Sequence, residues 1–387
     1  MKACALYVHI PFCKSKCAYC DFFSVVCKSG IDDAYIHKLL EEAELRAVQF
    51  GVSEWSTIYF GGGTPSLLLP NQIETLLNGL KAVRPIAENA EITFECNPDD
   101  ITLELLETLK KCGVNRLSVG LQAMNDVPLT LVNRRAHRAE NLRALDLLSK
   151  YWIDSLDSER KKRRLSVDLI CGLPGETSES FFAGLDEVIS CGADHISLYS
   201  LTLEENTPLF NAVDSGKINL PEAEEADSWW IKARDLLEKH GFLQYEVSNF
   251  ALKGCESRHN MAYWKMMPYI GIGAGATGTV EDFRYTNSCS IEEWLSGAGG
   301  EREMLTPDIQ KFEYLMMGFR TLEGVGTEEF RRRFGEDISV IEPVFSKWCG
   351  KGLAHKTKSR LALNKDGLLL LNCFLQEIMD FFSIKGN

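Results

Sequence analysis

The sequence shows no long hydrophobic run, and its first residues do not have the pattern expected of a secretory leader. Its longest late apolar run, Gly367 to Leu371, is far shorter than the roughly 20 residues that a membrane-spanning helix requires. The apolar stretch after Met1 is interrupted by His9 and Pro11, and no small-residue cleavage site follows it. We therefore expect no transmembrane segment and a cytoplasmic location.

An excess of positive charge is also absent. The 387 residues contain 42 Lys and Arg against 55 Asp and Glu, which gives a net charge of −13. Because non-specific binding of nucleic acid is driven by cationic side chains that release counterions, this balance disfavours a nucleic-acid partner. Cysteine, in contrast, is plentiful. The 13 cysteines cannot all pair with one another, so they are either reduced core thiols or, in part, metal ligands.

Short apolar runs rich in β-forming residues alternate with helical patterns over the first 200 residues. Because strands separated by helices are typical of repeated βα units, we predict an α/β fold with a parallel sheet or partial barrel. Functional residues of such folds follow the carboxyl ends of the strands. The predicted strands are Ala5 to Ile10, Thr57 to Phe60, Glu91 to Cys96, Arg116 to Leu121, Leu165 to Cys171 and His195 to Leu201.

Three regions are expected along the chain. Residues 1–220 hold the βα units, and residues 221–300 form an extension that begins with a long helix and contains a Gly-rich segment. Residues 301–387 show three helical patterns and two short strands, which resemble a winged-helix-like α+β domain. The basic run 160–164 is predicted to be a solvated loop, with an anion site as the alternative.

The strongest chemical signal is the CxxxCxxC motif formed by Cys13, Cys17 and Cys20 directly after the first predicted strand. Three thiolates can hold three irons of a 4Fe-4S cubane and leave the fourth iron open to a small molecule. A structural zinc site would more naturally use paired CxxC knuckles or histidines, and a disulfide framework does not suit a reducing compartment. Chance clustering in a cysteine-rich chain is the remaining alternative.

These motifs resemble the radical SAM superfamily, specifically its coproporphyrinogen dehydrogenase-like branch. The resemblance rests on the cysteine motif, YVHIPFC at Tyr7–Cys13, GGGTP at Gly61–Pro65, VDLICGLPGET at Val167–Thr177 and the C-terminal region. It implies a partial (β/α)6 barrel in which S-adenosylmethionine (SAM) chelates the open iron of the 4Fe-4S cluster. Members can cleave SAM reductively to methionine and a 5′-deoxyadenosyl radical.

The same resemblance assigns the SAM-contacting positions. From the residues alone, the glycines could serve turn geometry only. Glu95 could be a surface carboxylate or one that supports the site from behind, Arg134 could be a surface charge, and Asp168 could interact with a helix dipole or a loop. The positions implied by the family are Tyr7, Tyr19, Gly62, Gly63, Thr64, Glu95, Gln122, Arg134 and Asp168.

A missing cysteine separates two groups within this branch. The resemblance implies the longer motif CxxxCxxCxC for the oxygen-independent coproporphyrinogen III oxidases. This chain has Phe22 at the position of the last cysteine. The difference favours the haem-chaperone (HemW-like) subgroup, which implies haem, haem-acceptor proteins and an electron donor as partners. A coproporphyrinogen oxidase that decarboxylates its substrate to protoporphyrinogen IX is the alternative. A nucleic-acid-modifying enzyme is disfavoured by the acidic composition.

A second motif, HNxxYW, resembles the haem-associated motif of the haem chaperones. It comprises His259, Asn260, Tyr263 and Trp264, with His259 as candidate iron ligand. The alternative is a histidine that is hydrogen-bonded in a loop, with the aromatic side chains in the core. Cys255 is a candidate accessory ligand or an ordinary thiol, and there is no CxxCH motif for covalent haem attachment. The other cysteines, such as Cys96, Cys112, Cys171 and Cys191, are expected to be reduced core residues.

Overall fold

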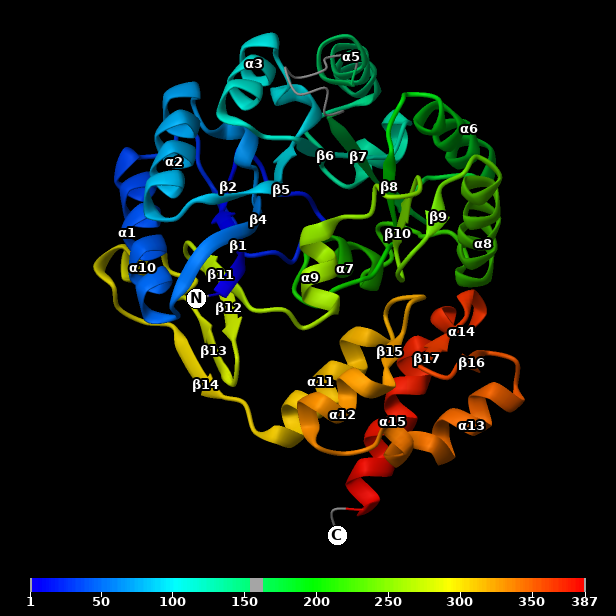
Figure 1. The fold of residues 1–387 in the computed structure, drawn as a ribbon. Coiled ribbons are helices and arrows are strands. Elements are labelled where there is room, and N and C mark those ends of the chain that lie inside the picture. The colour runs from blue at the N-terminus through cyan, green and yellow to red at the C-terminus, as the bar shows by residue number, and fades with distance from the viewer. Residues whose placement is uncertain (1, 154–162, 386–387) are drawn as a thin grey trace.

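The computed structural model describes residues 2–153 and 163–385 (Figure 1). One twelve-stranded sheet, in the order β14-β13-β12-β11-β1-β4-β5-β6-β7-β8-β10-β9, organises most of the chain. The run from β11 to β8 is parallel throughout, and the strands at either end are antiparallel. The strands of this sheet are β1 Lys2–Ile10, β4 Val52–Gly62, β5 Ile86–Cys96, β6 Arg116–Gln122, β7 Arg164–Cys171, β8 His195–Ser200, β9 Leu243–Gln244, β10 Asn249–Ala251, β11 Tyr269–Ile272, β12 Thr277–Val280, β13 Phe283–Thr286 and β14 Glu301–Met304.

Helices cover the outer face of this curved sheet (Figure 1). In the figure α1, α2, α3, α5, α6 and α8 form the outer layer, and α7 and α9 lie near its open side. The helices up to residue 300 are α1 Asp33–Gln49, α2 Pro70–Val83, α3 Leu103–Cys112, α4 Asp126–Leu131, α5 Arg138–Leu148, α6 Ser178–Ile189, α7 Pro208–Asp214, α8 Ala223–Lys239, α9 Arg258–Trp264 and α10 Ile291–Ser296. Short pieces are β2 Phe12–Cys13, β3 Val25–Val26 and the helical turns Pro65–Leu67, Pro98–Asp100 and Ser149–Ile153.

The predicted α/β fold with a partial barrel is confirmed, and each predicted strand lies within or overlaps an observed one. The prediction succeeded because parallel strands covered on both faces are continuously apolar. In β1, for example, every residue from Cys4 to Ile10 except Tyr7 is buried. Helix starts also carry local signals, since the side chains of Asp32 and Thr102 accept hydrogen bonds from the first turns of α1 and α3.

Residues 221–300 pack against the same core as the barrel. Trp229 and Trp230 of α8 and Trp294 of α10 belong to the hydrophobic cluster that surrounds β1. Strands β11 to β14 extend the sheet directly from β1. The sheet therefore continues without a break from the predicted barrel into the predicted extension.

The C-terminal unit, residues 307–385, has its own core around Phe319, Phe345 and Phe374. In Figure 1 it lies below the open side of the sheet, next to α9. Its small antiparallel sheet has the order β15-β17-β16, with β15 between the first two helices and with β16 and β17 between the third helix and the last two. Its elements are α11 Pro307–Gly318, β15 Val325–Gly326, α12 Thr327–Phe334, the turn Ile338–Ile341, α13 Glu342–Gly350, β16 Ala354–Lys356, β17 Arg360–Leu363, α14 Lys365–Leu369 and α15 Leu371–Lys385.

The basic run is only partly within the described residues. Arg160 to Lys162 lie outside them. Arg163 packs its guanidinium over the Trp152 ring at 5.3 Å from the centroid. Arg164 begins β7 and donates to the Gly254 carbonyl at 3.1 Å. The end of the run is therefore attached to the barrel.

Candidate functional site

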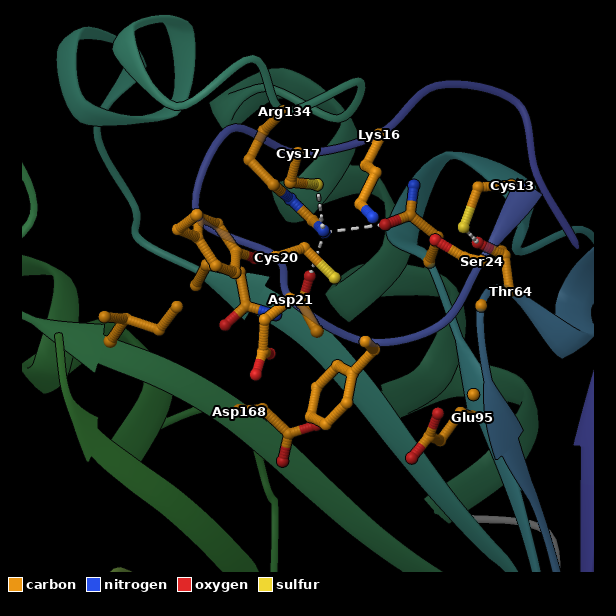
Figure 2. Close-up of a pocket in the computed structure, with 18 of the residues that line it drawn as sticks. Cys13, Lys16, Cys17, Cys20, Asp21, Ser24, Thr64, Glu95, Arg134 and Asp168 are labelled. Carbon is orange, nitrogen blue, oxygen red and sulfur yellow. Dashed lines mark hydrogen bonds between the residues drawn. The ribbon is translucent and has the colours of Figure 1, made fainter. Parts of the chain in front are cut away.

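A first cavity of about 430 Å³ opens at the carboxyl ends of the parallel strands. The loop that carries the three cysteines forms one wall, and the ends of β4 to β8 form the other (Figure 2). Convergent polar groups in a cavity at the strand ends mark the default ligand site of such a sheet. Of the predicted residues, it is lined by Cys13, Cys17, Tyr19, Cys20, Gly62, Gly63, Thr64, Glu95, Gln122, Arg134 and Asp168.

The three cysteines are free, half-buried thiols of one loop. The Cys13 Sγ accepts a hydrogen bond from Thr64 Oγ1 at 3.4 Å, and the Cys17 Sγ accepts one from Arg134 Nη1 at 3.5 Å. Burial raises the pKa of the Cys20 thiol, and the neighbouring Cys17 and Cys13 raise it further. All three cysteines line the first cavity.

Within residues 2–153 and 163–385, no three His, Cys, Asp or Glu side chains converge tightly enough to hold a single metal ion. A cubane cluster places a different requirement on its ligands, because each cysteine binds a different iron and the sulfurs surround the cluster rather than one point. Three thiols that line one cavity, one of them beside a guanidinium, suit that donor requirement.

Arg134 is the cation of the first cavity that contacts a motif cysteine directly, and Lys14, Lys16 and Arg135 also line this cavity. Its Nη2 donates to Asn97 Oδ1 at 2.6 Å and to the Gly120 carbonyl at 2.5 Å. Figure 2 shows the guanidinium beside Cys17 and Cys20. Its Nε is buried and has no hydrogen-bond partner in the described part of the chain. Arg134 is thus a half-buried group held beside the thiols, and not a free surface charge.

Two carboxylates lie on the opposite side of the cavity from Arg134 (Figure 2). Glu95 Oε1 accepts a hydrogen bond from the Tyr59 hydroxyl at 2.7 Å, and burial raises the pKa of Glu95 to about 7. Asp168 accepts from Ser118 Oγ at 3.1 Å and from Ser166 Oγ at 3.4 Å, and burial raises its pKa as well. A cationic ligand group would stabilise the ionised form of both.

The glycines of GGGTP have a packing role that the sequence did not specify. A Cβ on Gly62, whose φ is +109°, would lie 2.5 Å from the His9 ring. One on Gly63 would lie 2.8 Å from the backbone of Phe12 in the cysteine loop. Only glycine at these positions allows the turn to pack so closely against that loop. Gln122 has a φ of +66°, a left-handed conformation that a side-chain-bearing residue rarely adopts and that often marks a functional site.

Several residues that hold the side chains of the first cavity were missed from the sequence. Asn97 holds Arg134, Tyr59 holds Glu95, and Ser118 and Ser166 hold Asp168. Asn97 directly follows β5, so its position at a strand end is a usable signal. The serines and the tyrosine lie within strands, where their type alone indicates nothing.

A second cavity of about 750 Å³ lies between the barrel and the C-terminal unit. Side chains of β1, β11, β12 and the end of α9 form one side, and α11 and α12 form the other. Tyr7, a predicted SAM residue, lines this cavity, and its hydroxyl pairs with His9 Nδ1 at 2.9 Å. Phe22, which is 67% exposed, lines both cavities.

The HNxxYW motif is divided between this cavity and the core. Tyr263 and Trp264 line the second cavity, whereas His259 and Asn260 do not. His259 is 1% exposed, and its Nδ1 and Nε2 pair with Thr57 Oγ1 and the Tyr263 hydroxyl, each at 2.8 Å. Burial lowers the pKa of His259 to about 3, so the ring is neutral. This arrangement is the hydrogen-bonded alternative to haem ligation by His259.

Within the described part of the chain, the other cysteines join no group of three metal-ligating side chains. All 13 are free. Cys96, Cys112 and Cys171 are buried, as predicted, whereas Cys191 is only half-buried. Cys255, the candidate accessory ligand, contacts the guanidinium of Arg164.

The chain is similar to known proteins over nearly its whole length. A sequence model described as the radical SAM superfamily matches residues 7–187. The chain is 32% identical to the heme chaperone HemW of Bacillus subtilis, over 95% of this chain and 96% of the relative. It is 35% identical to HemW of Lactococcus lactis, over 96% of both chains.

A solved structure gives the corresponding result for the fold. Coproporphyrinogen III oxidase (HemN) from Escherichia coli, described as a radical SAM enzyme, matches with a TM-score of 0.80 at 23% identity, over 97% of this chain and 89% of its own. At this identity the match concerns the fold alone. Among the described residues, no helix is both long and apolar enough to cross a membrane.

Proposed function

The chain belongs to the HemW family of the radical SAM superfamily, and we propose that it is a haem chaperone that binds haem and passes it to acceptor proteins. The observation that carries this proposal is the near full-length similarity to relatives named as heme chaperones. Phe22 supports the proposal, because it occupies the position of the last cysteine in the CxxxCxxCxC motif of the oxidases.

We assign the 4Fe-4S cluster to Cys13, Cys17 and Cys20, and SAM to the first cavity. When bound, the cluster supplies the electron for reductive cleavage of SAM. Arg134 offsets the negative charge of the thiolates, and Tyr19 lines the cavity with it. Glu95 and Asp168 offer carboxylates to the cationic and hydroxyl groups of SAM. Gly62, Gly63 and Thr64 bring the turn after β4 against the cysteine loop, and Gln122 faces the same space.

The partners follow from this assignment. The cluster requires an external electron donor, and the haem requires acceptor proteins. The free cysteines support a reducing compartment such as the cytoplasm.

One pair of assays tests the proposed function. The anaerobically reconstituted protein is incubated with SAM, a reductant and coproporphyrinogen III, and in parallel it is titrated with haemin and then mixed with a haem-free globin. We expect stable haemin binding, transfer to the globin and no decarboxylation. Robust decarboxylation without stable haemin binding would overturn the chaperone assignment in favour of the oxidase.

A further inference from the structure

We propose that the second cavity is the haem-binding site, with the macrocycle against Tyr263 and Trp264 and a propionate carboxylate on Arg332. This inference rests on the proposed function and adds the location and the charge contact of the cargo. The cavity volume of about 750 Å³ lies within the range of ligand sites and exceeds the 430 Å³ of the first cavity.

One wall of the second cavity is a fixed aromatic surface. The Tyr263 ring packs edge-on against Tyr269, with centroids 4.6 Å apart, and its hydroxyl is held by His259. The guanidinium of Arg320 lies 4.9 Å from the centroid of the Trp264 ring. The indole N–H of Trp264 is buried and finds no acceptor within the described residues. A flat aromatic ligand can pack against such a wall without first having to fix the positions of its side chains.

Methionines add an adaptable apolar lining. Met266, Met267 and Met317 all line the cavity. Met266 has a φ of +50° in the turn that ends α9, a position at which glycine is the usual residue. A methionine in that strained place carries a polarisable side chain into the lining, and thioethers pack well against large, irregular apolar ligands.

The cations of the cavity differ in whether they already have partners. Arg284 pairs with Glu313 at 2.6 Å, and Lys265 pairs with Glu323 at 3.0 Å. Arg333 donates to the Met266 carbonyl at 3.2 Å. Arg332 has neither an ion pair nor a hydrogen bond to any residue that the structure describes.

The carboxylates of the cavity have partners other than Arg332. Glu313 is bound by Arg284, and Glu281 pairs with Lys2. Glu329 hydrogen-bonds Tyr314. Arg332 is therefore a cation beside an apolar cavity that is free for an anionic group of a ligand. An aromatic macrocycle with carboxylate side chains combines the two properties that this cavity selects.

The test compares two adjacent arginines of α12. Arg332→Gln removes the cavity cation, whereas Arg331→Gln changes a neighbour that pairs with Glu328 and Asp337 and does not line the cavity. Both reconstituted proteins are titrated with haemin and with haemin dimethyl ester, whose carboxylates are blocked. We expect Arg332→Gln to weaken haemin roughly tenfold and to leave the ester unchanged. Arg331→Gln should bind haemin as the wild type does.

A second variant tests the cavity independently of charge. Thr279 lines the cavity from β12, and Thr279→Phe places a ring in its volume. We expect roughly tenfold weaker binding of both haemin and the ester, with the iron-sulfur absorbance retained as the check on folding. Wild-type haemin affinity in folded Arg332→Gln and Thr279→Phe would overturn the assigned site. A wild-type protein that does not bind haemin would instead contradict the proposed function itself.

Discussion

The two cavities are built in different ways. The first lies on strand ends of a single sheet, and its charged groups are held by neighbours on that sheet, as Tyr59 holds Glu95 and Asn97 holds Arg134. The second is shared between the barrel and the C-terminal unit, which meet through contacts such as Arg333 with the Met266 carbonyl. The first is suited to retaining a cofactor in one geometry. The second is bounded by exposed contacts that can break, which suits a cargo that must leave.

The largest effect is expected from removing a proposed cluster ligand. Cys17→Ala should abolish the visible iron-sulfur absorbance of the reconstituted protein, because three thiolates are the minimum set proposed for the cluster. Haemin affinity should stay within about threefold of wild type, since Cys17 does not line the second cavity. Absorption spectra and haemin titration measure the two properties.

Cys27→Ala is the matched control. Cys27 is a free, half-buried thiol close to the motif, and its Sγ donates to the Gly30 carbonyl. This variant should keep both the cluster and haemin binding. Full iron-sulfur absorbance in Cys17→Ala would contradict the assigned ligand set.

The next effect concerns the pH dependence of SAM binding. Because the pKa of Glu95 is raised to about 7, chiefly by burial, its carboxyl group becomes charged as the pH rises through 7. SAM carries a sulfonium group whose charge does not depend on pH, so its affinity should be several-fold higher at pH 8 than at pH 6. Glu95→Gln should flatten this dependence in equilibrium binding assays.

Glu176→Gln is the control for that experiment. Burial also raises the pKa of Glu176 to about 7, but Glu176 accepts from the backbone of Gly172 and Leu173 and does not line the first cavity. The pH dependence of SAM binding should survive this change. A pH dependence that persists in Glu95→Gln would show that another group recognises the cation.

A smaller effect is expected from the motif histidine. Since His259 holds the Tyr263 hydroxyl from within the core, His259→Gln should weaken haemin about threefold and leave the Soret band of bound haem in place. A positioning residue alters affinity, whereas an iron ligand also alters the spectrum. A shifted Soret band in this variant would identify His259 as an iron ligand after all.

The same variant should change the response of stability to acid. The pKa of His259 is about 3 in the folded protein, lowered by burial from 6.5, so its neutral ring stabilises the fold above pH 6.5. That contribution is lost as the pH falls from 6.5 toward 3, because the unfolded chain binds the proton. The unfolding free energy from urea titrations at pH 7.5 and 5.5 should therefore fall less in His259→Gln than in the wild type. An equal fall would show that His259 can be protonated in the folded state.

The smallest effect is expected at the residue that the cavities share. Phe22→Ala should weaken both SAM and haemin by about two- to threefold, because Phe22 lines both cavities yet is 67% exposed. Val26→Ala, at an exposed residue that lines neither cavity, should change neither affinity. If Phe22→Ala weakened the binding of only SAM or only haemin, Phe22 would belong to one cavity and not to both.

The sequence was most informative where a feature is local. The strands were predicted because β1 and its parallel neighbours are apolar over several consecutive residues. The family resemblance named most of the side chains that line the first cavity, because Cys13 and Gly62 belong to short motifs after strands, Glu95 lies at the end of a strand, and the sheet brings such ends together. Tyr7 is an exception. It belongs to the same motif as Cys13, but the structure places it in the wall of the second cavity.

The second cavity could not be predicted, because its residues converge only when two cores pack together. Phe22, Trp264, Arg284 and Arg332 are far apart in sequence and belong to different elements. In the run of arginines that ends α12, nothing local distinguishes Arg332 from Arg331, which lies outside the cavity. For His259 the motif identified an important residue, but its two hydrogen-bond partners depend on how α9 packs on β4.

Simultaneous binding tests the separation of the two cavities most directly. SAM affinity of the cluster-loaded protein is measured by equilibrium dialysis with and without saturating haemin. If SAM occupies the first cavity and haem the second, haemin should change the SAM dissociation constant by less than about threefold, and one equivalent of each should be bound. Mutual exclusion of SAM and haemin would contradict the account, because it would place both ligands in one cavity.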